Sequence, residues 1–500
     1  MIISKFRILA LGLAFMALVS ACGSDKPNND DQTSGTGLDD IWPVQSVADL
    51  GYRLPAEWEP QESVWLAWTR TGSFYDEEFM KHSARHLIKT LHQDTSIKVD
   101  LVVTPNDEEI ATGKTYEEKR QEVENFLSDD VEGIGNAATE GNFIRYHNIP
   151  TTTFWMRDMG PVFLKNDAGL AMADFGFNMW DYELYTGVNS TIDDAVDRRI
   201  AQELEMPAFR CSLIAEGGNS QSDGNGTLLL NEYVARHRNP HMSLAEIEAE
   251  YKRCLGAEKI LWTKRGVVED FATYEGFAPG GFKYVYNDAF EIIGTEEVPT
   301  ALGAGTSGHT DEFAIFGPNN TILLAEVRPG DLDPAINQNQ YSRKRAAINK
   351  QRMDENYEIL KNATNADGVK YNIIRVPVAE SEFATLTKQN GGNIYSIYVG
   401  WEFEDGNMVP DGEDVDIMAA TGYLNVLITN QLVIVPSYYH DGLPDYLKPI
   451  TQANDQEVVE KFQALFPDRQ VVQFPYGYIM PYNWTGGGIH CANWQQPVAN

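Results

Sequence analysis

The residues best suited to chemistry stand near the end of the chain, where positions 486–491 read Gly-Gly-Gly-Ile-His-Cys. Consecutive glycines let the backbone adopt positive φ and approach a ligand closely, so they can present a reactive side chain on a loop. A cysteine in that place is suited to nucleophilic catalysis. The alternative is that Cys491 is a buried small hydrophobic residue. Three other stretches supply the partners that a nucleophile needs, and they favour catalysis.

Carboxylates and a histidine occur in these three stretches. The stretches are Trp-Met-Arg-Asp-Met-Gly-Pro with Asp158, Glu-Gly-Gly-Asn with Glu216, and Gly-His-Thr-Asp-Glu-Phe with His309 and Asp311. The two oxygens of a carboxylate match the N–H fork of a guanidinium, so Asp158 and Asp311 are candidate clamps. His309 and Asp311 are two residues apart and would share one face of an extended strand, where the histidine can move protons beside the clamp. The structural alternatives are an Asp158 that caps a turn or pairs with Arg157, a core His309, and a turn entrance at Glu216.

Taken in order, these stretches resemble the agmatine deiminase family, relatives of the bacterial (Porphyromonas-type) peptidylarginine deiminases in the guanidine-modifying superfamily. The similarity begins at Leu-Pro-Ala-Glu-Trp-Glu-Pro (54–60) and continues to the C-terminus. It implies the pentein fold, an α/β propeller of five ββαβ-type modules around a pseudo-fivefold axis with the active site in the central channel. It also implies that Trp58 and Trp180 contact substrate and that Asn425, in Gly-Tyr-Leu-Asn-Val, lies close to the nucleophile. The alternative for Asn425 is a strand-end residue that bonds to the backbone.

The resemblance further implies covalent catalysis on the central carbon of a guanidinium. Cys491 attacks as thiolate, His309 donates a proton to the departing nitrogen, and ammonia leaves. Water then enters with His309 as base and releases a ureido product. Glu216 would orient His309, while Asp158 and Asp311 hold the substrate. The reaction requires no cofactor, and no cluster of cysteine and histidine in the sequence suggests a metal site.

The substrate could be agmatine or arginine in a peptide. Residues 174–182 read Asp-Phe-Gly-Phe-Asn-Met-Trp-Asp-Tyr, which resembles the Phe-Asn-x-Trp stretch of agmatine deiminases, and no arginine follows before Arg198 to grip a peptide's C-terminal carboxylate. We therefore expect an agmatine deiminase, which makes N-carbamoylputrescine and ammonia, with a peptidylarginine deiminase as the alternative. Trp180-Asp181 departs from the Trp-Gly-Gly that agmatine deiminases usually show. A third alternative is an inactive surface binding protein with the same fold.

The elements that must position these residues alternate along the chain. Apolar residues at helical spacing predict helices over 78–93, 116–127, 191–204, 243–255, 343–361 and 456–466. Strands are expected over 97–104, 143–146, 162–164, 171–177, 321–327, 371–376 and 426–435. This alternation predicts an α/β protein built from ββαβ units. Two segments, 231–255 and the acidic 401–416, are expected as additions to a compact family member; the acidic one is a surface loop or, alternatively, a calcium site.

The N-terminus has the pattern of a lipoprotein signal peptide over residues 1–21. Lys5 and Arg7 precede an apolar run, 8–19, that is too short to cross a bilayer core of about 30 Å. Small residues before Cys22 resemble a lipobox, so Cys22 would carry a lipid; the alternative is an ordinary cleaved signal. Residues 22–48 then form a disordered tether and 49–500 a single pentein catalytic domain with insertions. We expect an extracytoplasmic protein anchored by lipid to a bacterial membrane.

Charge and cysteine content narrow the possible partners. The formal net charge of −34 argues against nucleic acid, because no basic patch can neutralise phosphates. It is compatible with a cationic guanidine substrate drawn in by the field of the protein, and equally with simple solubility. The chain has four cysteines. With Cys22 lipidated and Cys491 catalytic, Cys211 and Cys254 remain and could form one disulfide in an oxidising compartment, but the sequence does not establish their pairing.

Overall fold

The computed structural model describes residues 46–68, 77–183, 189–270, 275–287, 291–303, 305–389, 395, 398–399, 402–404 and 406–499. The expected signal peptide, Cys22 and all but the last three residues of the expected tether lie outside these ranges. Within them, no helix is both long enough and apolar enough to cross a membrane.

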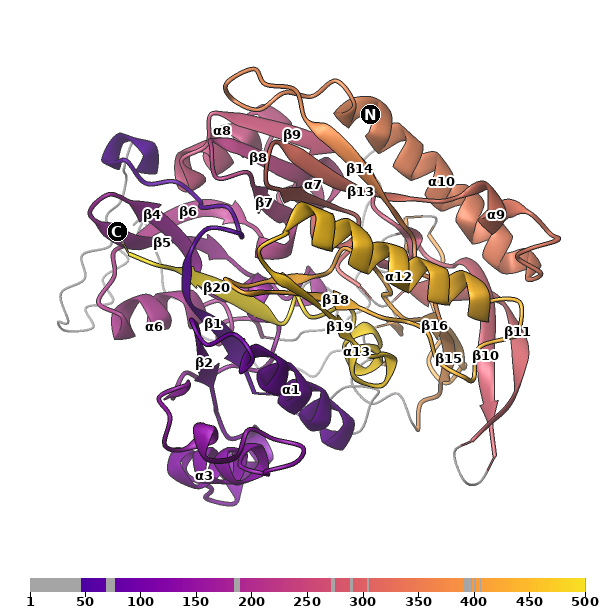
Figure 1. Cartoon of the computed structure of the whole chain (residues 1–500), viewed down its shortest axis with the longest axis horizontal. Helices are drawn as coiled ribbons and strands as arrows, with labels where there is room; N and C mark the ends of the chain where they lie inside the picture. The colour runs from indigo at the N-terminus through magenta and orange to yellow at the C-terminus, as the bar shows by residue number, and fades with distance from the viewer. Residues whose placement is uncertain are drawn as a thin grey trace, which may run out of the picture. The chain divides into compact units, whose positions relative to one another are not determined.

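Five small sheets share one pattern, an antiparallel strand pair followed by a parallel strand (Figure 1). Four of them are β4 (Val162–Asn166), β5 (Gly169–Gly176) and β6 (Ala208–Ile214); β7 (Ser220–Ser222), β8 (Thr227–Asn231) and β9 (Lys259–Thr263); β12 (Ala314–Gly317), β13 (Thr321–Glu326) and β14 (Asn372–Pro377); and β17 (Leu427–Ile428), β18 (Leu432–Pro436) and β19 (Gln470–Phe474). The predicted ββαβ-type modules are therefore present.

The fifth sheet joins the two ends of the described chain. The last strand, β20 (Asn493–Pro497), pairs antiparallel with β1 (Gln61–Ala67), and the yellow and indigo strands lie side by side in Figure 1. Beyond β1, the strands β2 (Lys98–Val102) and β3 (Ile144–His147) continue the sheet in parallel. Each of the other four modules has a turn just before its first strand. Because β20 pairs with β1, the residues just before 493 form the corresponding turn of the fifth module, at the same end of the module.

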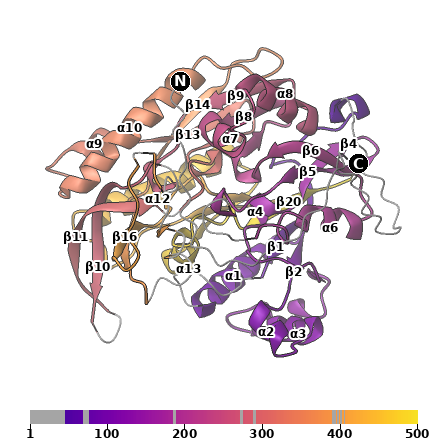
Figure 2. The ribbon, with the colours of Figure 1, turned by 180° about the vertical axis from the view of Figure 1, so that it is seen from behind.

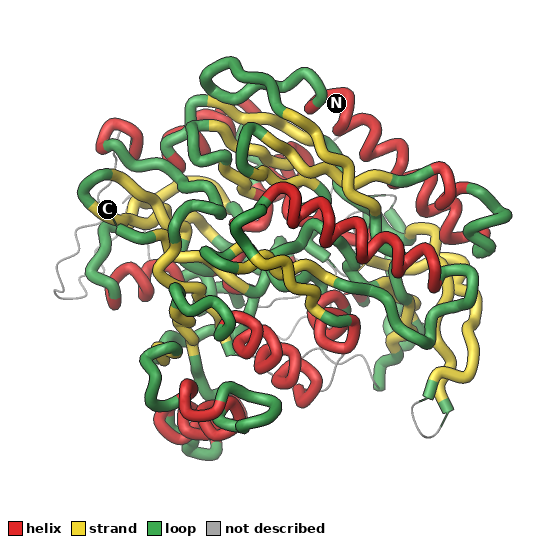
Figure 3. Tube along the Cα trace, viewed as in Figure 1, coloured by secondary structure: helices red, strands yellow, loops and turns green. Residues whose placement is uncertain are grey.

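A parallel strand requires a crossover, and helices provide it in every module. These crossover helices are α1 (Glu77–Leu91), α6 (Val196–Glu203), α8 (Leu244–Leu255), α10 (Gln340–Leu360) and α12 (Lys448–Leu465). Figure 2 and Figure 3 show them against the strands. Side-chain oxygens begin two of them: Ser243 forms a capping box with Glu246 before α8, and Asn339 accepts from two backbone N–H groups of α10.

The remaining elements are short or lie outside the five modules. The helices are α2 (Asp107–Ala111), α3 (Tyr116–Leu127), α4 (Met156–Met159), α7 (Glu232–Arg238), α9 (Pro329–Leu332) and α13 (Tyr476–Asn483). Five single turns of 3-10 helix are η1 (Val47–Leu50), η2 (Gly135–Ala138), η3 (Gly217–Asn219), η4 (Val268–Asp270) and η5 (Thr310–Glu312). A long hairpin of β10 (Ala278–Tyr286) and β11 (Ile292–Gly303) closes a small barrel with β15 (Phe383–Leu386) and β16 (Val415–Met418). The sequence patterns did not predict this hairpin.

Most of the predicted elements are found within a few residues of their expected bounds. The helix expected over 456–466 begins earlier, at Lys448, and the strand expected over 426–435 is two strands. It is interrupted because Asp94 accepts hydrogen bonds from the Gln431 backbone and the Thr429 hydroxyl, which bends the chain between β17 and β18. A single apolar core cluster extends from Val47 to Trp494 and joins side chains of all five modules.

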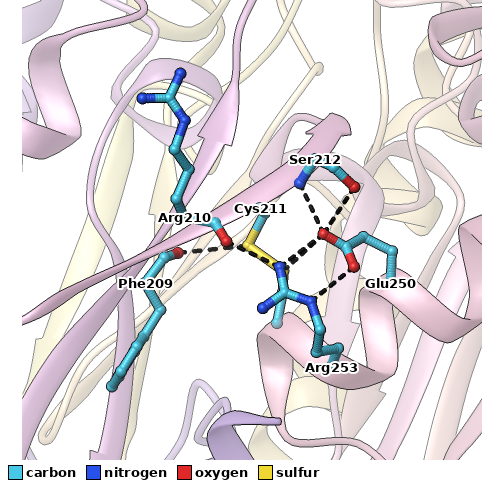
Figure 4. The surroundings of a disulfide bond; sticks show 7 residues. Phe209, Arg210, Cys211, Ser212, Glu250 and Arg253 are labelled. Atoms are coloured by element: carbon cyan, nitrogen blue, oxygen red, sulfur yellow. Dashed lines mark hydrogen bonds and ion pairs between the residues drawn. A yellow bond between two sulfur atoms is a disulfide. The ribbon is translucent and has the colours of Figure 1, made fainter. Parts of the chain in front are cut away.

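A disulfide joins Cys211 of β6 to Cys254 of α8, with their Cα atoms 6.1 Å apart. It thus connects the strand of one module to the crossover helix of the next. Figure 4 shows the polar contacts that surround it: Glu250 accepts from the Ser212 backbone and hydroxyl at 2.7 and 2.9 Å, and Arg253 donates to Glu250 and to the Arg210 carbonyl. The structure thereby supplies the pairing that the sequence left open.

Candidate active site

Each of the five modules places one predicted site residue in the turn just before its first strand. The five residues are Asp158 before β4, Glu216 before β7, Asp311 before β12, Asn425 before β17 and Cys491 before β20. Their exposed fractions are 6% or less. Corresponding turns of repeated modules lie at the same end of each module, so residues more than 300 positions apart in sequence meet in one site.

Cys491 lies against an amide and two carboxyl groups. The Nδ2 atom of Asn425 donates to the sulfur at 3.0 Å, which places Asn425 beside the candidate nucleophile as the sequence predicted. The sulfur is 3.5 Å from Asp311 Oδ2 and 3.6 Å from Glu312 Oε1. Burial and the charges of Asp311 and Glu312 raise the pKa of the Cys491 thiol well above its ordinary value, so the thiol is protonated at neutral pH.

The glycine run before Cys491 is required by close contacts. A β-carbon on Gly487 would lie 2.9 Å from the Cys491 sulfur, and one on Gly488 would lie 2.4 Å from Asn425 Oδ1. Gly486 has a φ of +103°, which side chains rarely adopt. The expected role of these glycines, close backbone approach, is therefore present at the nucleophile.

His309 lies between two carboxylates. Its Nδ1 is 3.7 Å from Asp158 Oδ1 and its Nε2 is 3.6 Å from Glu216 Oε2, and the ring is completely buried. Burial lowers the pKa of His309, but the charges of Asp158 and Glu216 outweigh it and raise the pKa to about 9. The imidazole is therefore cationic at neutral pH and can donate a proton.

The prediction that His309 and Asp311 lie on an extended strand is wrong. Residues 310–312 form η5, and the strand β12 begins only at Ala314. The two side chains nevertheless approach each other, because both meet at Gly218, where a β-carbon would lie 2.5 Å from His309 Nδ1 and 3.0 Å from Asp311 Oδ2. The loop is held in turn by Asp270, which accepts from the backbone of Gly308 and His309 at 2.9 and 2.8 Å.

Glu216 is held by a buried arginine that the sequence analysis did not select. Arg238, at the end of α7, donates through Nε to Glu216 at 2.5 Å, through one terminal nitrogen to Asp181 at 3.1 Å, and through the other to the Thr306 carbonyl at 3.0 Å. Burial raises the pKa of Glu216, but the Arg238 and His309 charges outweigh it and lower the pKa to about 2. The Arg238 guanidinium thus keeps Glu216, the partner of His309, ionised at neutral pH.

Asp158 does not pair with Arg157, and its carboxylate bonds to an indole and to one backbone N–H of η3. It accepts from Trp180 Nε1 at 2.8 Å and from the Gly218 backbone at 3.2 Å, while Arg157 pairs with Glu57 instead. Burial raises the pKa of Asp158 to about 6, with Asp311 and Glu216 adding to it and His309 opposing it. Trp180 has a φ of +55°, an uncommon conformation that turns its indole onto Asp158.

Asp311 is oriented by a second histidine, His490, whose Nδ1 lies 2.7 Å from Asp311 Oδ2. The next residue, Glu312, accepts from Asn425 Nδ2 at 2.7 Å. Burial, with the nearby charges of Asp311 and Asp270, raises the pKa of Glu312 well above its ordinary value. The sequence did not single out Glu312 or indicate a role for His490. The only sign of either residue was that Glu312 follows Asp311 and His490 precedes Cys491, both of which were selected.

Several buried polar atoms of the site lack a hydrogen-bond partner among the described residues. They are Glu216 Oε2, Asp311 Oδ1 and both ring nitrogens of His309. Buried polar groups are nearly always paired in folded proteins, so a cluster of exceptions requires an explanation. Glu216 and Asp311 each have an unpaired acceptor oxygen, and the imidazolium of His309 has unpaired N–H donors. A ligand that matches them has N–H groups for the two oxygens and a nitrogen that can accept a proton from His309.

A pocket opens above Cys491. Its described lining is Trp155, Asp158, Trp180, Tyr182, Gly305, Thr306, Tyr398, Thr485, Gly486 and Cys491. Aromatic rings dominate this lining, and within the described part Asp158 is the only charged residue. Trp58, predicted to contact substrate, is not part of the lining described; it is partly buried against the core, and its carbonyl accepts from Arg469.

One group of described residues has spacing that could hold a metal ion, namely Asp311, Glu312 and Cys491. Their ligand atoms lie within 4.8 Å of one another. Asn425 contacts two of these atoms, and His490 contacts the Asp311 oxygen, so protein groups already occupy one side of each. The acidic stretch 401–416 contributes no such group within its described residues.

Comparisons with known proteins agree with this geometry. The sequence profile of the Porphyromonas-type peptidyl-arginine deiminase family matches residues 53–275 and 294–497. An agmatine deiminase of Pseudomonas aeruginosa is 27% identical over 463 residues, which cover 91% of this chain and 98% of that protein. The solved agmatine deiminase of Enterococcus faecalis superposes with a TM-score of 0.59 at 22% identity, covering 90% and 97% of the two chains. That of C. jejuni has a TM-score of 0.53 at 16% identity, covering 90% and 96%.

Fold and site together define a class, the pentein enzymes that hydrolyse C–N bonds of linear amidines with a cysteine nucleophile. Within that class, the chain belongs to the Porphyromonas-type peptidyl-arginine deiminase family. The predicted fold and the predicted resemblance are confirmed. The two segments expected as additions, 231–255 and 401–416, lie inside the matched ranges, and the gap instead covers 276–293, which includes most of the β10–β11 hairpin.

Proposed function

We propose that this protein is an agmatine deiminase that hydrolyses agmatine to N-carbamoylputrescine and ammonia through a covalent cysteine intermediate. The observation that carries the proposal is the convergence of Cys491, His309, Asp158, Asp311 and Glu216 from four modules, with unpaired acceptors on Asp311 and Glu216. A guanidinium supplies N–H donors for such acceptors and a positive charge among the buried carboxylates.

The resting charges define the order of the steps. The Cys491 thiol is protonated in the free enzyme, and a bound guanidinium between Asp158 and Asp311 adds the positive charge that favours thiolate, so that the thiol releases its proton to solvent. The sulfur then forms a bond to the guanidinium carbon. His309, cationic at neutral pH, transfers its proton to the departing nitrogen, and the C–N bond breaks to release ammonia.

The second half of the reaction uses the same groups in reverse. Neutral His309 accepts a proton from water as the oxygen attacks the amidino carbon. The C–S bond breaks, Cys491 is regenerated, and the ureido product leaves. Glu216 favours the cationic form of His309 throughout, because its own pKa is held at about 2 beside Arg238.

Two features support agmatine over a peptide. Four aromatic rings line the described pocket, Trp155, Trp180, Tyr182 and Tyr398, and aromatic faces attract cations. Within the described lining there is no arginine or lysine that could pair with the carboxylate of free arginine or of a peptide's terminus. Curated relatives over nearly the full length bear the name agmatine deiminase.

We also propose that the protein acts outside the cytoplasm on a lipid anchor at Cys22. The Cys211–Cys254 disulfide supports an oxidising compartment, where such bonds persist. Replacing Cys22 by serine should move the protein from the membrane fraction to the soluble one. A Cys22→Ser protein that stays in the membrane fraction would contradict the anchor and leave the catalytic proposal intact.

The test of the activity is release of ammonia and ureido product from agmatine, free arginine and an arginine peptide, offered side by side. We expect turnover of agmatine, and none by Cys491→Ser at unchanged melting temperature, because serine is a far weaker nucleophile here. Equal turnover by Cys491→Ser would exclude this residue as nucleophile. Turnover of the peptide alone would support a peptidylarginine deiminase. Absence of turnover with all three compounds would support a binding protein.

A further inference from the structure

Two residues of the sequence motifs meet behind the substrate clamp and have no part in the mechanism above. They are Glu57, of the Leu-Pro-Ala-Glu-Trp-Glu-Pro stretch, and His490, of the Gly-Ile-His-Cys stretch. His490 lies with Nδ1 at 2.7 Å from Asp311 Oδ2 and Nε2 at 2.7 Å from Glu57 Oε1. Hydrogen bonds therefore connect Asp311 through the His490 imidazole to Glu57.

This geometry determines the charge of His490. A neutral imidazole carries one N–H and can donate to only one of two carboxylates, whereas the imidazolium donates to both. Three charged groups from separate elements face the ring: Asp311 of η5, Glu57 of the segment before β1, and Arg157 of α4. Burial and the Arg157 charge lower the pKa of His490, but Glu57 and Asp311 outweigh them and raise it.

The cation leaves Asp311 with one free oxygen. Oδ2 is taken by His490, while Oδ1 is buried and lacks a hydrogen-bond partner among the described residues. The Cys491 sulfur also lies 3.5 Å from Oδ2, so Oδ1 is the oxygen of Asp311 left to accept from a ligand.

Glu57 connects the pair to a second pocket, away from Cys491. Its lining includes Glu57, Arg157, Ser220 and Gln495, and Cys491 is not part of it. The Glu57 side chain is 18% exposed, whereas those of His490 and Asp311 are 2% and 0% exposed. Of the three side chains, Glu57 is therefore the one that solvent reaches.

We infer that Glu57 and His490 are positioning residues: Glu57 keeps His490 cationic, and His490 holds Asp311 turned so that Oδ1 meets the guanidinium. This inference rests on the proposed function, and it assigns a task to two motif residues that the mechanism left unused. It predicts that removing the Glu57 charge acts on the clamp without any contact between Glu57 and substrate.

The test compares Glu57→Gln and His490→Asn with wild type in the full-length protein. Glutamine keeps an acceptor for Nε2 but has no charge, so the pKa of His490 should fall by about one unit or more. Because the active form needs cationic His490, activity is lost as pH rises through that pKa, and the alkaline limb of kcat/KM should move to lower pH. Asparagine at 490 keeps a donor near Asp311 without charge, and should raise KM for agmatine about ten-fold or more while changing kcat less.

The chain offers a matched control in His147. Its two ring nitrogens also face carboxylates, Asp100 at 2.8 Å and Glu203 at 2.6 Å, in a sheet position away from Cys491. Glu203→Gln and His147→Asn should lower the melting temperature and leave the pH limb and KM unchanged. If Glu57→Gln and Glu203→Gln behave alike, with stability loss and no shift of the limb, the role is merely structural and the inference is wrong.

A second measurement does not depend on activity. Nitrogen NMR of histidine-labelled protein reports the protonation of each ring, and the resonance that disappears in His490→Asn identifies His490. We expect this ring to be cationic at neutral pH in wild type and to titrate at lower pH in Glu57→Gln. A neutral His490 in wild type overturns the inference, even if agmatine is turned over. If no guanidine is turned over but His490 is cationic and responds to Glu57, the proposed function fails while the inferred pairing stands.

Discussion

At the scale of single residues, the site combines a carboxyl group, Asp158, and a histidine, His309, whose pKa values are both raised. Burial raises the pKa of Asp158 to about 6, and neighbouring carboxylates raise that of His309 to about 9, although burial alone would lower it. Between these values, both groups are ionised in the forms that clamp a guanidinium and protonate its departing nitrogen. Pairs of buried groups whose pKa values are pushed apart in this way are characteristic of acid–base catalysts.

The pH dependence of turnover follows from these two shifts. Asp158 must be ionised, so activity should fall as pH drops through about 6. His309 must be protonated, so activity should fall as pH rises through about 9. We expect a bell-shaped profile of kcat/KM for agmatine, because this ratio reports the free enzyme. A profile that is flat across this range would contradict the assignment of both residues.

The acid limb can be assigned with one substitution. Asp158→Asn should reduce kcat/KM by several orders of magnitude if the carboxylate clamps substrate, since a charge-assisted bidentate contact in a closed site is lost. Asp174→Asn is a matched control, because Asp174 is a buried carboxylate whose pKa is also raised and whose partner, Arg198, lies away from Cys491. It should change stability and leave the acid limb in place.

At the scale of elements, the site depends on turns that bring backbone and side chains unusually close. Gly218 of η3 is one of these, because a β-carbon there would meet His309 Nδ1 at 2.5 Å and Asp158 Oδ1 at 3.1 Å. Gly218→Ala should therefore displace the proton donor, and we expect about a hundred-fold loss of kcat. Gly477→Ala in α13 adds the same methyl group where no atom lies within 4 Å, and should leave kcat unchanged. Turnover assays with melting curves of both variants separate misplacement from unfolding.

The disulfide gives a second element-scale prediction. Cys211 and Cys254 are 43 residues apart, and closing a loop of that length stabilises a protein by about 2 to 4 kcal/mol. Double replacement by alanine should reduce the free energy of unfolding by about that amount, as measured in urea, and reduction of wild type should approach the same midpoint. Because neither sulfur contacts the site, kcat at low temperature should be retained. Loss of kcat without loss of stability would mean that the β6–α8 junction positions the site.

Sequence reasoning found the site better than it found the elements around it. Short motifs with glycine near a reactive residue identified Cys491, His309, Glu216 and Asp158. Close approach of the backbone requires glycine, and glycine can be recognised in the sequence. Sequence reasoning did not find Arg238 and Glu57, since a buried arginine or glutamate in an ordinary helix or loop resembles a surface residue until its partners are known. Trp58 lies within a recognised motif but is not in the described lining of the pocket, so its contact with substrate stays a prediction.

The elements themselves were predicted where a periodic pattern ran without interruption. The helix α3 and the strand β13 have such patterns and were found nearly to the residue. The hairpin of β10 and β11 was missed because polar and small residues alternate irregularly over much of β11, which is exposed along most of its length. The expected strand under His309 was wrong because Asp270 accepts from the backbone N–H groups of Thr306, Gly308 and His309 and from the Thr306 hydroxyl, which no local pattern reveals.

At the scale of the whole molecule, the net charge of −34 could have two effects. Its electrostatic field could draw a cationic substrate to the site, or the charge could only keep the protein in solution. The two possibilities differ in their response to salt. A field that draws in a cation raises the rate of encounter, and salt screens it over a Debye length that falls from about 30 Å at low ionic strength to about 8 Å at physiological strength. Solubility alone predicts no effect on kinetics.

We expect kcat/KM for agmatine to fall as sodium chloride is added, while kcat stays constant, because screening affects encounter and not the bound complex. Agmatine carries two positive charges and free arginine a net charge of one, so the slope against ionic strength should be steeper for agmatine wherever both are turned over. Potassium chloride should reproduce the slope, since screening depends on ionic strength and not on the ion. A kcat/KM that is independent of salt for both substrates would assign the charge to solubility, and the aromatic lining and the buried carboxylates alone would then account for selection of a cation.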